Sequence, residues 1–337
     1  MRSRQLIVAA NAMLVMTVAC APSIGVPGPT QMQAWAVYFD GDRGLAELEE
    51  HGDLFDRVSL FGYELSPDGS PVPAPNVKTM LGPFLRLAQE KGFEPWVTVV
   101  NDVRHSGDSV VAKDSTVVHE LLVDSSRRDN HVRELVALVV EAGFQGLHLD
   151  YEQVAESDSA QFQGFIERLS GELRQRERGL EVVLEPVNGP LPAAGTSTVI
   201  VMAYDLFGAH SGPGPRSTPD FVTGLGPRAE VDADSAAALA VAVRGFAWRP
   251  NDEVTSLDWS EAQQRAAGAQ RARRSAADVP NARLDDGTEI WFEDRASLIS
   301  KWRAAWLAGF RRLAIWRLGG NDERLFDLLR DLRPDSE

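Results

Sequence analysis

Three side chains that can hold or transfer a proton recur at alternate positions in one short segment. His148, Asp150 and Glu152 are separated from one another by single apolar or aromatic residues. Because successive side chains of a β-strand point to opposite faces, these three share one face of the strand that the segment predicts. A carboxyl group beside a second carboxylate can have a pKa raised toward neutrality, as general acid catalysis requires. The alternative interpretation is a surface strand with a solvated polar face.

The residues before this strand indicate which of its faces is buried. Apolar side chains recur at helical spacing between Val132 and Val140, and Gly143 follows as a stop signal. A helix there would pack against the apolar face of the strand, so the polar face would point into the protein. Since burying an unpaired charge costs several kcal/mol, we interpret the polar row as functional.

Short apolar runs alternate with helical stretches along most of the chain, and these elements must position the polar row. The strand candidates are residues 35–39, 57–65, 95–100, 146–152, 180–185, 199–204, 239–243 and 313–316. This alternation predicts a parallel α/β fold, and the number of strands favours a closed (β/α)8 TIM barrel over an open sheet. Barrel active sites lie at the carboxyl ends of the strands, where Glu152 falls. Asn101 and Asp102 follow the third strand, and we interpret them as a loop turn rather than as substrate contacts.

The alternation is interrupted once, before the last strand. Residues 249–289 are polar and rich in Ala and Arg, which favours helical structure, and Asp285-Asp286-Gly287 is a turn signal. We therefore expect a small insertion inside one barrel domain that spans residues 34–333.

The first residues have the pattern of an export signal. Arg2 and Arg4 precede an almost wholly apolar run, residues 6–19, which is shorter than the roughly 20 residues needed to cross a bilayer. The run ends in a sequence that resembles a bacterial lipobox, although Thr17 stands where Leu is usual. We expect residues 1–20 to be a lipoprotein signal with a lipidated Cys20, and residues 21–33 to be a tether. The protein would then be held outside the cytoplasm at the cell envelope by a lipid anchor, or secreted.

Charge and composition argue against several other functions. The formal net charge of −15 repels phosphate backbones, so nucleic acid is not expected as a partner. The single cysteine excludes an intrachain disulfide. The histidines lack the spacing of metal ligands, and no glycine-rich phosphate loop stands between a strand and a helix. We expect no metal ion and no cofactor, and we expect a monomer.

Motifs in three parts of the chain resemble glycoside hydrolase family 18. Residues 145–152 resemble its strand-four signature, Asp-x-x-Asp-x-Asp-x-Glu, in which Glu152 matches the catalytic acid and Asp150 the last aspartate. Residues 201–205 resemble its strand-six sequence Met-x-Tyr-Asp. They are followed by residues 212–215, which the family also has at that place. The remaining matches resemble the branch with spore-cortex and peptidoglycan-associated members, and they comprise residues 291–294, Ser297, Lys301 and 315–320.

The resemblance implies retaining hydrolysis of β-1,4-linked N-acetylglucosamine polymers, in which the substrate's acetamide oxygen attacks C1. Glu152 would protonate the glycosidic oxygen, and Asp150 would hold the acetamide N–H. Tyr204 would hydrogen-bond the acetamide carbonyl, and Asp205 would contact sugar hydroxyls or Glu152. Trp316 would lie beneath the sugar, because an aromatic face suits the apolar face of a pyranose. Chitin, peptidoglycan and N-glycan cores all carry the acetamide group that this mechanism needs.

Two positions depart from the family signature, because Gln145 and His148 stand where it has aspartates. In the family the middle aspartate shares a proton with the last one. We therefore expect His148 to donate to Asp150 in its place, with activity falling as the imidazole titrates. Gln145 is expected to be structural.

Alternatives remain open for the roles of single residues and for the function of the whole protein. Tyr204 and Trp316 have alternative roles as core residues and Asp205 as a cap, while Trp248 is left open between packing and sugar binding. For the whole protein, the alternatives are a catalytically weak or inactive chitinase-like carbohydrate-binding protein and an envelope scaffold. We favour the hydrolase because Glu152 is retained.

Overall fold

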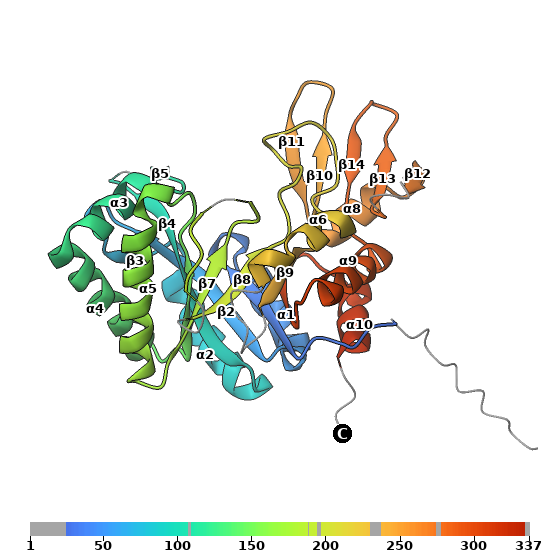
Figure 1. The fold of residues 1–337 in the computed structure, drawn as a ribbon. Coiled ribbons are helices and arrows are strands. Elements are labelled where there is room, and N and C mark those ends of the chain that lie inside the picture. Colours follow the sequence, from blue (N-terminus) through green and yellow to red (C-terminus); the bar gives the residue numbers. More distant parts are fainter. Residues whose placement is uncertain are drawn as a thin grey trace, which may run out of the picture.

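The computed structural model describes residues 25–106, 109–187, 189–193, 197–229, 237–273 and 278–333. The barrel strands are β1 Gln31–Val37, β2 Arg57–Leu65, β4 Glu94–Arg104, β6 Gly146–Asp150, β7 Gly179–Leu184, β8 Thr198–Met202, β9 Ala238–Ala242 and β15 Arg312–Trp316. Each pairs in parallel with its two neighbours, in the order β1-β2-β4-β6-β7-β8-β9-β15 and back to β1 (Figure 1). Every strand overlaps a predicted run, and the (β/α)8 TIM barrel is confirmed.

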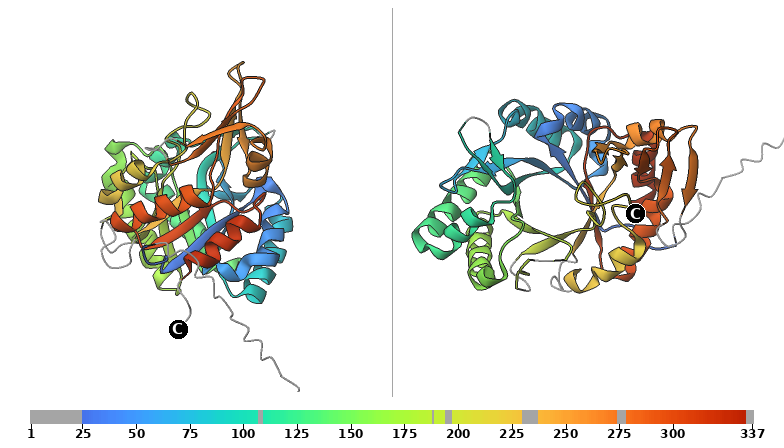
Figure 2. Two further views of the ribbon diagram at one scale, coloured as in Figure 1. Left: turned by 90° about the vertical axis from the view of Figure 1, so that its right-hand side faces the viewer. Right: turned by 90° about the horizontal axis from the view of Figure 1, so that it is seen from above.

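Helices surround the barrel on its outer side, as the view from above in Figure 2 shows. They are α1 Arg43–His51, α2 Val77–Lys91, α3 Ser115–Val123, α4 Ser125–Glu141, α5 Ser159–Arg174, α6 Pro219–Gly224, α7 Gly226–Ala229, α9 Arg295–Leu307 and α10 Glu323–Leu332. Short strands and 3-10 helices lie in the connections of the barrel. They are β3 Pro71–Pro73, β5 Val110–Val111, η1 Tyr38–Asp40, η2 Gly52–Leu54 and η3 Glu156–Asp158. The helix expected before the polar strand is α4.

Small residues leave room for large aromatic rings inside the barrel. Alanines of β9 and β15 are fully or almost fully buried, and they belong to the same inner cluster as Trp35 and Tyr204. Glycine is required at two neighbouring positions, because a Cβ on Gly146 or Gly179 would lie 2.5 Å from the ring of Trp96. Complementary side-chain sizes of this kind fill the interior of a barrel to native density.

A buried ion-pair network closes the floor of the barrel around Glu181, whose side chain is inaccessible to solvent. Arg57 Nη1 lies 2.9 Å from Glu181 Oε1, Arg312 also pairs with Oε1, and His148 Nε2 lies 3.0 Å from Oε2. Burial alone raises the pKa of Glu181, but Arg312, His148 and Arg57 outweigh it and hold that pKa well below its usual range. The network keeps Glu181 ionised without contact with water.

The insertion before β15 differs from the predicted helical segment. It is an antiparallel sheet in the order β11-β10-β14-β13-β12, and it stands above the carboxyl ends of the barrel strands (Figure 1). Its elements are β10 Gly245–Trp248, β11 Val254–Leu257, α8 Trp259–Arg265, β12 Gln270–Arg273, β13 Pro280–Arg283 and β14 Glu289–Trp291. The helical prediction holds only for α8, and it was wrong for the other described elements of the insertion, because strand pairing there overrides the helix propensity of Ala and Arg. The predicted turn at 285–287 is confirmed between β13 and β14, with Gly287 at φ 86°.

We expected a tether at residues 21–33, but in the structure residues 31–33 belong to the first barrel strand. β1 begins at Gln31, and the carbonyl of Pro27 accepts a 3.0 Å hydrogen bond from Trp302 Nε1 on α9. The signal segment and Cys20 lie outside the described residues. Within the described ranges, no helix combines the length and the apolar character needed to cross a membrane.

We expect Glu181→Gln to lower the free energy of unfolding by about 3–5 kcal/mol, because it leaves buried cations without their carboxylate. Since the folded-state pKa of Glu181 is depressed, its contribution is present above the unfolded pKa and is lost as pH falls. Urea unfolding at pH 7 and at lower pH measures both effects. The control Glu172→Gln removes an exposed helix pair with Arg176 and should change stability by less than about 0.5 kcal/mol. Equal losses in the two variants would contradict this role of the network.

Candidate active site

The predicted alternation along β6 is confirmed. His148 and Asp150 are 1% and 8% exposed, and the ring of His148 lies between those of Trp35 and Trp96, with centroids 5.5 and 5.2 Å away. The intervening leucines pack outward in the main core. The closed sheet therefore turns the polar face of β6 into the barrel.

Asn101 fixes the backbone at Glu152, directly beyond the end of β6. Its Oδ1 accepts a 3.0 Å bond from the Glu152 N–H, and its Nδ2 donates at 2.9 Å to the Glu152 carbonyl. Asn101 and Asp102 lie within β4, which extends to Arg104, so their interpretation as a loop turn was wrong. The parallel pairing of β4 with β6 brings the amide to Glu152.

Lys113 forms an ion pair with the Glu152 carboxylate. It comes from the connection between β5 and α3, and its backbone N–H donates at 2.9 Å to Asp102 Oδ1. Burial raises the pKa of Glu152, and the positive charge of Lys113 opposes this shift. The negative charges of Glu185 and Asp205 raise the pKa further, so that it lies above its usual value. No sequence motif pointed to Lys113, because only the fold brings its loop to Glu152.

Asp150 and Tyr204 form the inner part of the site. Burial raises the pKa of Asp150 well above its usual range, and the nearby charge of Glu152 raises it further. Burial also raises the pKa of Tyr204, with contributions from Asp150 and Asp205, so its phenol stays neutral and can donate a hydrogen bond. Asp150 Oδ1 is buried and accepts no hydrogen bond from the described residues. The site thus offers a free carboxyl oxygen and a neutral phenol.

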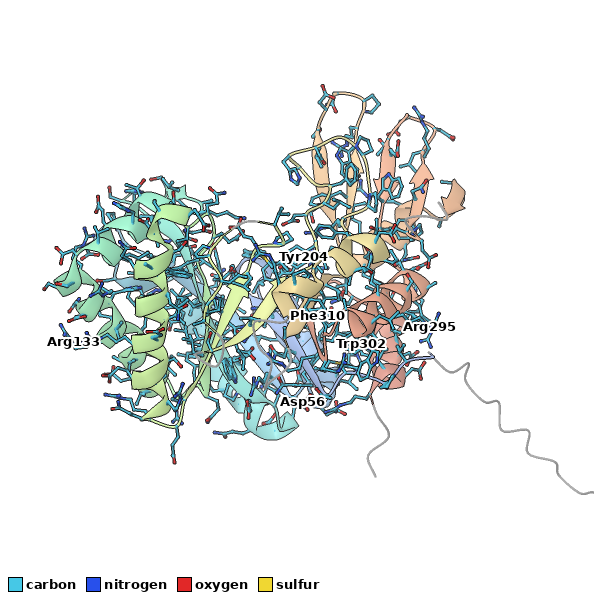
Figure 3. The ribbon with its side chains drawn as sticks, in the orientation of Figure 1. Asp56, Arg133, Tyr204, Arg295, Trp302 and Phe310 are labelled. Atoms are coloured by element: carbon cyan, nitrogen blue, oxygen red, sulfur yellow. The ribbon has the colours of Figure 1, made fainter. Side chains whose placement is uncertain are left out.

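Asp205 lies one residue beyond Tyr204 and is half exposed. Its Oδ1 lies 2.8 Å from Arg216 Nη2, and the Arg216 guanidinium lies over both the Tyr204 ring and the Phe246 ring of β10, at 5.3 and 5.0 Å. Arg216, which the sequence did not single out, therefore links the end of β8 to the insertion. Figure 3 shows Tyr204 at the upper end of the barrel, below the insertion.

Trp316 at the end of β15 lies among aromatic rings in the upper part of the barrel. Its ring is stacked at 19° to that of Tyr204 with centroids 6.3 Å apart, and it meets Trp35 and Phe61 edge-on. The side chain is partly exposed, so it is available to a ligand at the barrel mouth. Trp248 is buried in the insertion and donates at 3.0 Å to the Ser211 carbonyl, which gives it a packing role.

The structure corrects the expected role of His148. Neither ring nitrogen forms a hydrogen bond with Asp150, and the partner of the imidazole among the described residues is the Glu181 carboxylate on the floor side, with Nε2 3.0 Å from Oε2. Burial lowers the pKa of His148, and Glu181 only partly offsets this. The imidazole is thus neutral at neutral pH and belongs to the floor network. The misassignment arose because sequence spacing gives the shared face but not the partner on β7.

Three residues of the site have backbone conformations that side chains disfavour. Lys113, Gln153 and Asp205 have φ of 54°, 58° and 70°, in the left-handed region. Gln153 is held there by its N–H, which donates at 2.8 Å to Glu185 Oε2. Such conformations cost about 1–3 kcal/mol each and cluster at functional sites. Here they direct side chains at the ends of separate strands.

The group of described residues that could hold a metal ion lies elsewhere, on α1 and α10. His51 Nε2 is 3.0 Å from Glu323 Oε1 and 3.6 Å from Glu50 Oε2. However, Arg330 Nη2 lies 3.1 Å from His51 Nδ1, and a guanidinium only donates. Nδ1 must then accept, so Nε2 carries the proton and has no lone pair for a metal. This group is an ion-pair cluster.

Comparisons with known proteins support the barrel fold. The Bacillus subtilis protein YdhD, named as a sporulation-specific glycosylase, is 24% identical over 307 residues, which cover 83% of this chain and 69% of YdhD. The spore cortex-lytic enzyme SleL of Bacillus megaterium has a TM-score of 0.75 at 17% identity, covering 91% of this chain and 74% of SleL. A chitinase of Chromobacterium violaceum has a TM-score of 0.77 at 18% identity, covering 90% of this chain and 98% of the chitinase. No family model matches the chain. The relative and the structural neighbours are chitinase-like proteins that share the barrel.

We expect Lys113→Met to raise the pKa of Glu152 further, because the lysine opposes the shift caused by burial. The titration of the Glu152 side-chain carboxyl, followed by NMR with ¹³C-labelled glutamate, measures this change. Lys78→Met removes the same charge from an exposed position on α2 and should leave the titration as in the wild type. A Glu152 pKa that does not move in Lys113→Met would show that the ion pair is absent in solution.

Proposed function

We propose that this protein is a glycoside hydrolase of the family 18 type, which cleaves β-1,4-linked N-acetylglucosamine polymers with retention of configuration. The observation that carries the proposal is the proximity of Asp150, Glu152 and Tyr204 at the ends of β6 and β8: Glu152 acts on the pKa of Asp150, both carboxylates act on that of Tyr204, and the Tyr204 ring stacks near that of the partly exposed Trp316. Chitinase-like relatives with the same barrel support it.

Glu152 is the proton donor in this mechanism. The substrate's acetamide oxygen attacks C1 while the bond from C1 to the leaving oxygen breaks, and that oxygen takes the proton of Glu152. Water then attacks C1 of the oxazolinium intermediate and gives a proton back to Glu152, while the bond between C1 and the acetamide oxygen breaks and the acetamide is restored, which completes the cycle. The pKa of Glu152 is raised by burial, which favours the protonated form that the first step needs.

Asp150 and Tyr204 orient the attacking acetamide. The unpartnered Oδ1 of Asp150 is suited to accept the acetamide N–H and to stabilise the positive charge of the oxazolinium. The neutral phenol of Tyr204 is suited to donate to the acetamide oxygen and hold it near C1. Trp316 offers its ring to the apolar face of the sugar, and Asp205 offers its exposed carboxylate to sugar hydroxyls.

The second candidate is a carbohydrate-binding protein with weak or no turnover. One observation favours this candidate. The ion pair with Lys113 stabilises the ionised form of Glu152, and a carboxylate in that form cannot donate a proton. Both candidates bind the same class of glycan. For either, the N-terminal segment that ends at Cys20 supports export to the cell envelope, by lipid anchor or by secretion.

We expect Glu152→Gln to reduce kcat on N-acetylchitotetraose by at least about 100-fold, because glutamine keeps the shape but cannot give up a proton. Affinity for the oligosaccharide should persist. Mass analysis of products and calorimetric titration measure the two properties. A wild type that binds the glycan without cleaving it would identify the second candidate, and a wild type that does not bind it would reject both.

We expect Tyr204→Phe to lower kcat by about 100-fold with little change in KM, because the phenol assists the attack rather than the initial binding. Steady-state kinetics on the same oligosaccharide separate the two constants. A rise in KM at constant kcat would instead assign Tyr204 to ground-state binding. Circular dichroism checks that the variant keeps the fold.

A further inference from the structure

Cations accompany the carboxylates at the barrel mouth, and one of these cations differs in its exposure. The arginines that pair with Glu64, Asp205 and Asp40 have side chains that are 8–17% exposed. The side chain of Lys113 is 38% exposed, whereas its partner Glu152 is 15% exposed. Among these ion pairs, Lys113 is the most exposed cation; Arg43 is more exposed still, at 52%, but it pairs with Asp258 and not with a carboxylate of the site.

The chemistry of lysine also suits a change of partner. An arginine holds a carboxylate through a planar fork, but a lysine ammonium is a compact charge on a flexible stem with three donors. Its interaction with one carboxylate can therefore be exchanged for another with little movement. The arginines at the mouth lack this freedom because they are almost buried.

The backbone of Lys113 is nevertheless held in place. Its N–H bonds to Asp102 Oδ1 at 2.9 Å, and the next N–H, of Asp114, bonds to the Asn101 carbonyl at 2.9 Å. Asp114 then caps α3 through bonds to its first N–H groups. These contacts keep Lys113 at φ 54°, which is otherwise unfavourable for a side chain. The loop thus positions one cation beside the proposed acid.

The ion pair conflicts with the task of Glu152 in the proposed mechanism. The acid must be protonated before it can donate, but protonation removes the negative charge that Lys113 faces. The other carboxylates whose charge acts on Lys113 are Asp150, Glu185 and Asp102. A carboxylate brought by the substrate could take the place of Glu152 as the partner of the ammonium. Binding of that anion and protonation of Glu152 would then favour each other by linkage.

We propose that Lys113 is a specificity residue that selects glycans carrying a carboxylate next to the scissile bond. This inference rests on the proposed function and narrows its substrate class. The lactyl group of N-acetylmuramic acid carries such a carboxylate in peptidoglycan strands that have lost their stem peptides, and chitin has none. On binding, the ammonium of Lys113 moves from Glu152 to the substrate carboxylate, and Glu152 takes up a proton from solvent. That proton is the one later given to the leaving oxygen.

The test compares two glycans that differ in one charge. The first is the tetrasaccharide of alternating N-acetylglucosamine and N-acetylmuramic acid with free lactyl carboxylates, and the second is the same glycan with those groups converted to primary amides. We expect wild-type kcat/KM to be about tenfold higher for the carboxylate form. Lys113→Met should remove this preference, and the control Lys78→Met should retain all of it.

Affinity for the two glycans gives a second readout that does not depend on turnover. Calorimetry on the Glu152→Gln background should show the same preference, and adding Lys113→Met should abolish it. Hydrolysis with no preference, or a preference that survives in Lys113→Met, overturns the role of Lys113 and leaves the proposed function standing. A Lys113-dependent preference in binding without hydrolysis rejects the hydrolase and upholds Lys113 as the selective residue. If neither glycan binds, both proposals are wrong.

Discussion

Closure of the parallel sheet is the constraint on which the site depends. A single strand has two equivalent faces, and only closure makes one of them the interior of a barrel. For β6, closure turns the histidine and the aspartate inward and the leucines outward against the helices. The same closure brings the ends of β4, β6 and β8 to one mouth. Asn101, Glu152 and Tyr204 are far apart in the chain and meet for that reason alone.

The two ends of the barrel interior use charge in different ways. At the floor, Glu181 is surrounded by cations and its pKa is held well below the usual range. Higher up, burial raises the pKa of both Asp150 and Glu152, and a single lysine opposes the shift of the latter. A carboxylate surrounded by fixed partners stabilises structure, whereas one with few partners can change its protonation state. The barrel therefore separates its structural carboxylate from its reactive ones.

The insertion is joined to the site rather than merely placed above it. Arg216 contacts Asp205, Tyr204 and the Phe246 ring of β10. Trp248 of the same strand bonds to Ser211 in the segment after β8. Below the insertion, the buried ion pair between Glu293 and Lys301 joins the chain after β14 to α9. These contacts tie the position of the sheet to the residues that would meet a sugar.

Apolar periodicity and alternation are local properties of the chain, so they predicted the eight strands, the barrel and the inward face of β6 with Asp150 and Glu152. The candidates Tyr204 and Trp316 came instead from the resemblance of their motifs to glycoside hydrolase family 18. Local propensity failed for the strands of the insertion, where strand pairing outweighed it. The partners of these side chains depend on how separate strands and loops come together: Glu181 lies beside His148, Asn101 and Lys113 contact Glu152, and Arg216 pairs with Asp205. Such pairs join separate segments of the chain, so no spacing within one segment encodes them.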